Sequence, residues 1–124
     1  MKLIIGGACQ GKLEFAKERF GFGDGDVFTC GDHRLDLTKP CVYKLEEFIY
    51  SCLQNGEKPL EILKDREKEW ENTVFICQDL SCGVVPLSAD QRAWRQETGL
   101  VCQYLAKRAV SVSRIFCGLE QKLK

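Results

Sequence analysis

The chain has 124 residues and a mass of 14.1 kDa, which is the size of one ordinary domain, so a single domain over residues 1–124 is expected. Its residues are 44% hydrophobic and 29% charged, with only three prolines, which excludes a disordered tail, a collagen-like chain and a coiled coil. Eighteen basic residues balance eighteen acidic ones. No net field attracts nucleic acid or an anionic membrane, so a bound anion has to be held by local groups.

Eight cysteines are the unusual feature of the composition. In a small secreted protein such a number suggests a disulfide framework. Residues 1–7 are too short an apolar run for a signal peptide, and no stretch approaches the length of a membrane span. Several cysteines, such as Cys77 and Cys117, lie inside apolar runs, where a reduced thiol behaves as a small hydrophobic side chain. We therefore expect a cytoplasmic protein with reduced, buried thiols, the alternatives being disulfides or a metal site.

Strand and helix patterns alternate along the chain. Apolar runs predict strands at 3–5, 27–30, 73–77 and 110–117. Helices are expected at 12–20, from Val42 or Tyr43 to Leu53, at 60–70 as a charged and exposed helix, and at 88–108. Ser88 and Gln91 have the spacing of a capping box that starts the last helix. Residues 33–42 are expected to form a loop, and 121–124 a short hairpin arm. This order predicts an α/β fold with a mostly parallel sheet covered on both faces.

Residues 6–12, Gly-Gly-Ala-Cys-Gln-Gly-Lys, have the Gly-x-x-x-x-Gly-Lys form of a phosphate-binding loop. The glycines let the loop wrap, so that its backbone N–H groups point at phosphate oxygens while Lys12 pairs with the outer phosphates. The helix that follows adds its positive N-terminal end. The pattern predicts a P-loop NTPase-like three-layer sandwich; the alternative is a glycine turn with a solvated lysine. The predicted site for ATP or GTP comprises Gly6, Gly7, Ala8, Cys9, Gln10, Gly11, Lys12 and Leu13.

Leu13 departs from the motif, which has a serine or threonine at this position. The missing hydroxyl is the group that binds Mg²⁺. Nucleotide binding survives the change because the loop holds phosphate mostly through its backbone, whereas phosphoryl transfer relies on the metal to neutralise developing charge. A bound Mg²⁺ is therefore not favoured, and Asp32 and Asp79, which each follow a predicted strand, are the carboxylates that would hold one.

The chain from Gln78 onward resembles one family in particular. Residues 78–86 are similar to the Asn-Glu-Val-Gly-x-Gly-Ile-Val-Pro segment of the adenosylcobinamide kinase/adenosylcobinamide-phosphate guanylyltransferase family. Residues 92–103 match the register of its Arg-x-x-Arg-Asp-x-x-Gly-x-x-Asn-Gln helix, and 115–124 resemble its closing strand and hairpin. The resemblance implies a kinase of cobalamin biosynthesis that acts on a cobinamide-type substrate and assembles as a homo-oligomer, such as a trimer.

The helix of residues 88–108 carries candidate substrate contacts. Arg92, Arg95, Gly99 and Gln103 share one stripe at helical spacing. The opposite side, which contains Ala93, Trp94, Leu100, Val101, Tyr104 and Leu105, is expected to face the core. The alternative for the arginines is a solvated face. Gly99 weighs against it, because a glycine inside a helix costs about 1 kcal/mol unless something must approach closely.

The predicted catalytic set is Lys12, Asp79 and Arg95, and Arg92, Gly99 and Gln103 are assigned to substrate. Asp79 ends an apolar strand, where open α/β sheets place their ligands, and it would orient metal-bound water or a substrate hydroxyl. The alternative is a carboxylate that caps the loop.

His33 is the only histidine of the chain, and so the only candidate for the family's guanylyl acceptor. The family's basic, tryptophan-containing stretch does not follow it, and the middle of the chain is shorter than in the family. Guanylyl transfer is therefore not expected. Three functions stay open: a kinase, a non-catalytic nucleotide- or phosphate-binding accessory protein, and a phosphate-ester binder unrelated to cobalamin.

Overall fold

The computed structural model describes residues 1–80 and 88–124 of the chain. The strands are β1 (Lys2–Gly6), β2 (Val27–Thr29), β3 (Cys41–Tyr43), β4 (Val74–Gln78), β5 (Ser111–Phe116) and β6 (Leu119–Lys122). The helices are α1 (Lys12–Phe20), α2 (Leu45–Gln54), α3 (Pro59–Asp65) and α4 (Ala89–Arg108), with short 3₁₀ turns at Asp24–Asp26 and Glu67–Glu69. The predicted α/β class is confirmed.

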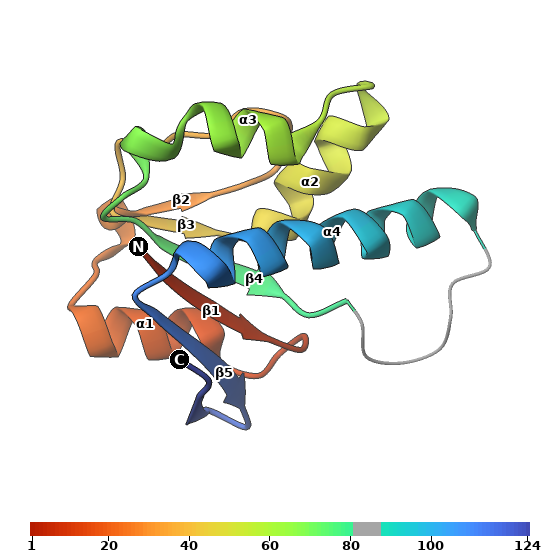
Figure 1. The fold of residues 1–124 in the computed structure, drawn as a ribbon. Helices are drawn as coiled ribbons and strands as arrows, with labels where there is room; N and C mark the ends of the chain where they lie inside the picture. Colours follow the sequence, from red (N-terminus) through yellow and green to blue (C-terminus); the bar gives the residue numbers. More distant parts are fainter. Residues whose placement is uncertain (81–87) are drawn as a thin grey trace.

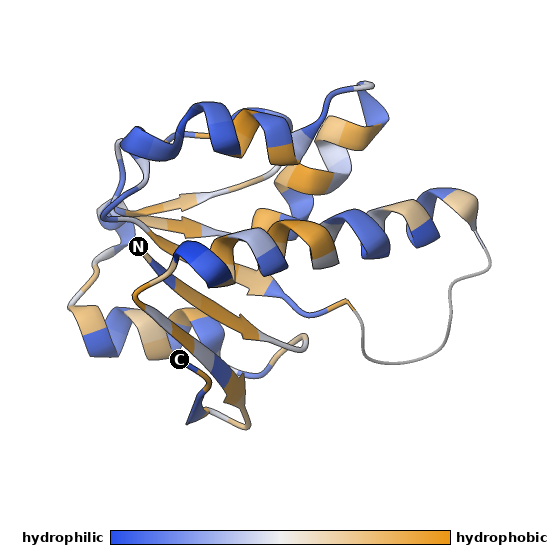
Figure 2. Cartoon of the chain, in the orientation of Figure 1, coloured by the Kyte–Doolittle hydropathy of each residue, from blue (hydrophilic) through white to orange (hydrophobic). Residues whose placement is uncertain are grey.

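The strands form one six-stranded sheet in the order β2-β3-β4-β1-β5-β6. All neighbouring pairs are parallel except β5 and β6, which form the predicted C-terminal hairpin. β1 lies at the centre of the sheet, between β4 and β5 (Figure 1). The central strands β1 and β4 are mostly apolar between Lys2 at one end and Gln78 at the other, as expected of strands covered on both faces (Figure 2).

Helices cover the two faces of the sheet unequally. One face packs against α2, α3 and α4 around residues such as Phe48, Leu63 and Leu105. Among the described residues, the helix that packs on the other face, with Ile4 and Ile76, is α1, through Ala16. Figure 1 shows α1 below the sheet and the other three helices above it. The expected three-layer arrangement is therefore present, with one thick and one thin helical layer.

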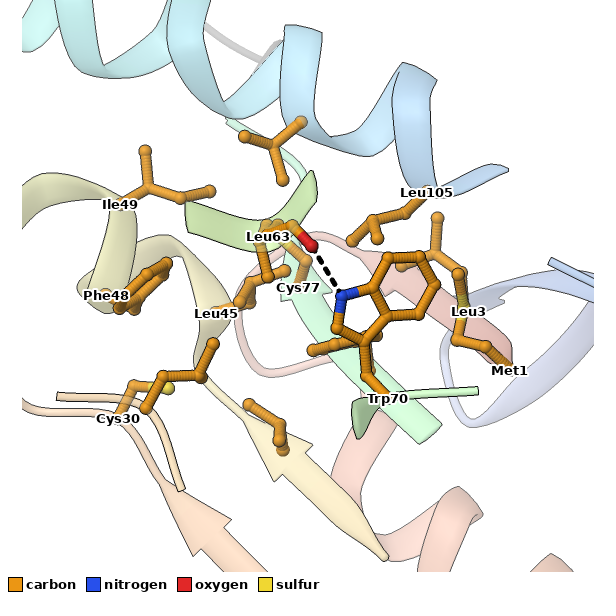
Figure 3. Packing of buried hydrophobic residues seen from close by; sticks show 14 of the residues in the cluster. Met1, Leu3, Cys30, Leu45, Phe48, Ile49, Leu63, Trp70, Cys77 and Leu105 are labelled. Carbon is orange, nitrogen blue, oxygen red and sulfur yellow. Dashed lines mark hydrogen bonds between the residues drawn. The ribbon is translucent and has the colours of Figure 1, made fainter. Parts of the chain in front are cut away.

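Trp70 anchors the layer formed by α2, α3 and α4 to the core. Its indole is 2% exposed and donates a hydrogen bond from Nε1 to the carbonyl of Leu63 at 2.8 Å (Figure 3). Its ring meets Phe75 and Tyr104 edge-on, with centroids 5.9 and 6.1 Å away. Because a buried indole needs a partner for its N–H, this bond ties the segment after α3 to the core.

Three sequence predictions were wrong. Residues 33–42 are not all loop, because β3 begins at Cys41 and pairs with both β2 and β4. The helix predicted at 60–70 ends at Asp65, and its Leu63 and the following Trp70 are buried instead of exposed. On α4, Leu100 is 42% exposed and Ala93 is also exposed, instead of facing the core. Tertiary packing outweighs the charged composition in the second case, and β3 is too short for a periodic pattern.

Candidate functional site

The predicted phosphate-binding loop lies at the carboxyl edge of the sheet. β1 ends at Gly6 and α1 begins at Lys12, as predicted, so residues 7–11 connect the central strand to the helix. The connection after β1 runs to β2, on one side of β1 in the sheet. The connection after the neighbouring strand β4 runs in the opposite direction, past β1 to β5. The chain therefore diverges between the ends of β1 and β4. Open α/β sheets bind their ligands at such a point.

The loop needs glycine where it leaves the strand. A Cβ on Gly6 would lie 2.5 Å from the backbone oxygen of Ile115 in β5, and neither backbone can give way. The carbonyl of Gly6 accepts the N–H of Asp79 at 2.7 Å, which joins the ends of β1 and β4. Gly11, with φ +88°, turns the chain into α1. The backbone geometry therefore requires glycine at Gly6 and Gly11, whether or not a phosphate is bound.

The loop also presents backbone N–H groups. Within residues 1–80 and 88–124, no backbone carbonyl accepts a hydrogen bond from the N–H groups of Ala8, Cys9 or Gly11. The first N–H groups of α1 lack intrahelical partners, as in every helix, and carry its positive end. Together these groups can hold an anion without any net charge on the protein.

The turn of the C-terminal hairpin clamps the loop. The backbone carbonyl of Gln10 accepts the N–H of Gly118 at 2.9 Å, and its side-chain Oε1 accepts the N–H of Cys117 at 2.7 Å. Cys117 and Gly118 both have positive φ, as the two central residues of a tight hairpin turn require. Sequence analysis assigned Gln10 to the loop but did not link it to the hairpin, since nothing in the sequence shows this contact.

Lys12 is only 8% exposed, and its Nζ donates to the carbonyl of Gly7 at 2.6 Å. It opens on a cavity of about 240 Å³ between the loop and the start of α2, which we call the loop cavity. The loop cavity is lined by Ala8, Cys9, Lys12, Tyr43, Lys44, Glu46, Ile76 and Gln78. Sequence analysis missed Glu46, although the spacing of the apolar residues of α2 places it beside a buried stripe.

A second cavity of about 310 Å³, which we call the helix cavity, lies between the carboxyl end of β4 and α4. It is lined by Ile5, Gln78, Asp79, Leu80, Arg95, Thr98, Gly99, Cys102 and Gln103. Four residues singled out in the sequence, Asp79, Arg95, Gly99 and Gln103, therefore meet on its walls. Gln78 lines both cavities, so the helix cavity adjoins the loop cavity.

Thr98 is a further residue of the helix cavity that sequence analysis missed. It is 2% exposed, and its hydroxyl has no hydrogen-bond partner among the described residues. A buried hydroxyl without a partner costs free energy, so a polar ligand atom in the cavity would relieve that cost. Next to it, a Cβ on Gly99 would meet nothing within 4 Å. No described protein atom therefore makes the close approach that would explain Gly99, and the position lines the cavity.

Several other candidates do not line either cavity, among them Gly6, Gly7, Gln10 and Gly11 of the loop itself. His33 is exposed, and Asp32 hydrogen bonds the backbone and guanidinium of Arg34, which holds the pKa of its carboxyl below the usual range. Arg92 is exposed near the start of α4. Leu13 lies on α1 and is partly buried against the sheet-face cluster that contains Ala16, Ile4 and Ile76. No group of three metal-binding side chains occurs among the described residues.

The cysteines divide by location. Cys30, Cys41, Cys52 and Cys77 are buried, whereas Cys9 and Cys117 are exposed, so the expectation that Cys117 is buried was wrong. Burial raises the pKa of the Cys30, Cys41 and Cys52 thiols to about 12, which keeps them protonated. The seven cysteines at described positions are all free thiols.

Comparisons with known proteins add nothing to the geometry: no protein-family model matches the chain, and no curated protein matches it. Much of the segment that carries the family resemblance, residues 81–86, lies outside the described residues. No helix within 1–80 or 88–124 has both the length and the apolar composition to cross a bilayer.

Proposed function

We propose that the chain is a P-loop nucleotide-binding protein that holds the phosphates of ATP or GTP at residues 6–12. The observation that carries the proposal is the position of this loop, between the central strand and α1 at the point where the chain diverges. A phosphate bound in this position would contact backbone N–H groups, a helix N-terminus and Lys12.

We further propose that the bound nucleotide phosphorylates a hydroxyl of a cobinamide-type acceptor. The support is the convergence of Asp79, Arg95, Gly99 and Gln103 on the helix cavity, beside the loop cavity. At about 310 Å³ the helix cavity can hold only a hydroxyl-bearing arm of so large a molecule. Lys12 would face the outer phosphates, and Arg95 would face the acceptor or the charge that develops during transfer. The same proposal includes a homo-oligomer, as the resemblance implies, and a cytoplasmic location, as expected from reduced thiols.

A thermal-shift screen of ATP, GTP and cobinamide, each with and without Mg²⁺, tests the proposal. A ligand at a hundred times its dissociation constant stabilises the folded protein by about 2.7 kcal/mol. We expect a nucleotide to raise the melting temperature, and cobinamide to raise it further when a nucleotide is present. No shift with either nucleotide would contradict the phosphate site. A shift with nucleotide alone would leave only the cobinamide proposal in error.

A second candidate function is non-catalytic binding of nucleotide or phosphate in an accessory protein. It is favoured by Leu13, whose side chain packs into the core and offers Mg²⁺ no oxygen. We expect Mg²⁺ to add little to ATP affinity in the native protein and to add more in Leu13→Ser. Calorimetric titration of ATP in EDTA and in Mg²⁺ measures both. A strong Mg²⁺ requirement in the native protein would contradict this and would point to a carboxylate near the loop.

In either case guanylyl transfer is not expected, because exposed His33 lines neither cavity. Incubation with α-³²P GTP should leave no label on the protein. Acid-labile labelling that disappears in His33→Asn would contradict this expectation.

A further inference from the structure

The loop cavity contains a buried carboxylate, that of Glu46. The side chain is 5% exposed, although it belongs to the first turn of α2 and faces the cavity that Lys12 also lines. Glutamate is almost never fully buried without a partner or a role. Lys44 is the other basic residue on this cavity wall. Glu46 is therefore the one acidic residue on the described wall of a cavity that Lys12 and Lys44 also line.

Contacts on two sides hold Glu46 in place. Its Oε2 accepts the backbone N–H of Gln78 at 3.0 Å, which fixes the carboxylate against the end of β4. Its backbone carbonyl accepts the indole N–H of Trp94 at 2.7 Å, which fixes α2 against α4. A carboxylate has about four lone-pair sites. The backbone hydrogen bonds therefore leave acceptor capacity on a group whose position is already set.

The surroundings of Glu46 favour proton binding. Burial raises the pKa of its carboxyl, and the hydrogen bond from Gln78 and the charge of Lys12 only partly offset this. The neighbouring Glu47 acts in the same direction as burial. The buried thiols of Cys30 and Cys77, both of which feel the charge of Glu46, have raised pKa values and stay uncharged. The ammonium of Lys12 acts in the opposite direction and lowers the pKa of Glu46.

We propose that Glu46 is the proton acceptor for the hydroxyl that attacks the terminal phosphate; this inference rests on the proposed phosphotransferase function. The acceptor oxygen forms a bond to the γ-phosphorus while the bond from that phosphorus to the β,γ-bridging oxygen breaks. The bridging oxygen keeps the electron pair and leaves on the nucleoside diphosphate. The hydroxyl proton moves to a carboxylate oxygen of Glu46, which later releases it to solvent. A carboxylate positioned in this way contributes about 10²- to 10⁴-fold to a rate.

The test compares Glu46→Gln with Glu47→Gln, a matched change at the next residue of the same helix, which lines neither cavity. ADP release from ATP is measured with cobinamide as acceptor and with water alone, and ATP binding is measured by calorimetry with and without Mg²⁺. We expect Glu46→Gln to bind ATP as well as or better than the native protein and to lose 10²- to 10⁴-fold in turnover. Glu47→Gln should retain both properties. Glu46→Asp should recover part of the rate, and the native rate should fall at low pH as Glu46 takes up its proton.

The outcomes that overturn the inference are distinct from failure of the proposed function. Turnover retained in Glu46→Gln contradicts a proton acceptor. Loss of ATP affinity only in the presence of Mg²⁺ would make Glu46 a metal ligand, and loss of folding in both Glu46→Gln and Glu46→Asp would make it structural. A native protein that binds ATP without turnover overturns the inference but leaves the phosphate site intact. A native protein that binds no nucleotide overturns the proposed function itself.

Discussion

At the scale of single residues, Gly99 lowers the stability of α4, and no contact among the described residues requires a glycine there. A glycine inside a helix is about 1 kcal/mol less favourable than alanine. A Cβ at this position meets nothing within 4 Å among the described residues, and the position lines the helix cavity. The space that the glycine leaves open is therefore available to a ligand.

We expect Gly99→Ala to raise the free energy of unfolding by up to about 1 kcal/mol and to weaken cobinamide binding. Urea denaturation and calorimetry measure the two effects. Ala93→Gly is the reciprocal control, because Ala93 is exposed on the same helix and lines neither cavity, so it should destabilise by about 1 kcal/mol and leave binding unchanged. A less stable Gly99→Ala protein would show that the position is needed for packing.

Glu46 predicts a pH dependence of folding stability. Because burial raises the pKa of its carboxyl above the unfolded value, the folded state holds this proton more tightly than the unfolded state. The group's contribution is therefore most favourable below its ordinary pKa of about 4.5 and is lost as the pH rises through the folded pKa. We expect Glu46→Gln to be more stable than the native protein at neutral pH, with the difference shrinking as the pH falls towards 4.5. Urea unfolding of both proteins between pH 4 and 8 tests this; a difference that grows at low pH would contradict it.

At the scale of elements, the β5–β6 hairpin supports the loop through Gln10. Replacing Gln10 by alanine removes the side-chain bond to Cys117 and leaves the backbone bond to Gly118. One such bond is worth about 1 kcal/mol, so we expect the melting temperature to fall by a few degrees and ATP affinity to fall by up to about fivefold. Gln121→Ala, an exposed change on the same hairpin, is the control. Equal affinities in the native protein and Gln10→Ala would show that the hairpin does not shape the site.

Local signals predicted some elements closely and missed others for physical reasons. α4 begins after Ser88, whose side chain accepts the N–H of Gln91, and α1 spans the predicted residues 12–20, because capping and glycine positions are local. β3 exists through its pairing with two neighbouring strands, which no short apolar run reveals. Likewise, the motif residues of the loop could be named in advance, whereas the burial of Glu46 depends on how α2 packs beside β4.

At the scale of the whole molecule, the parallel strands bring the candidate groups together at their carboxyl ends. The loop follows β1, Asp79 follows β4, and Glu46 lies two residues into α2 behind β3. Because these three strands are parallel and adjacent, their carboxyl ends meet, and the two cavities share Gln78. The thick helical layer supplies α4 and α2 as walls, while α1 supplies the positive helix end.

The central claim is that residues 6–12 bind the phosphates of a nucleotide, and calorimetric titration of ATP and GTP into the native protein and Lys12→Ala tests it most directly. A charge-assisted hydrogen bond is worth about 1.5–3 kcal/mol, so we expect binding to the native protein and an affinity about 10- to 150-fold lower in Lys12→Ala. Lys17→Ala is the control, because Lys17 lies on the same helix but pairs with Asp24 at 2.6 Å. Equal affinity in the native protein and Lys12→Ala, or no binding of either nucleotide to the native protein, would contradict the claim.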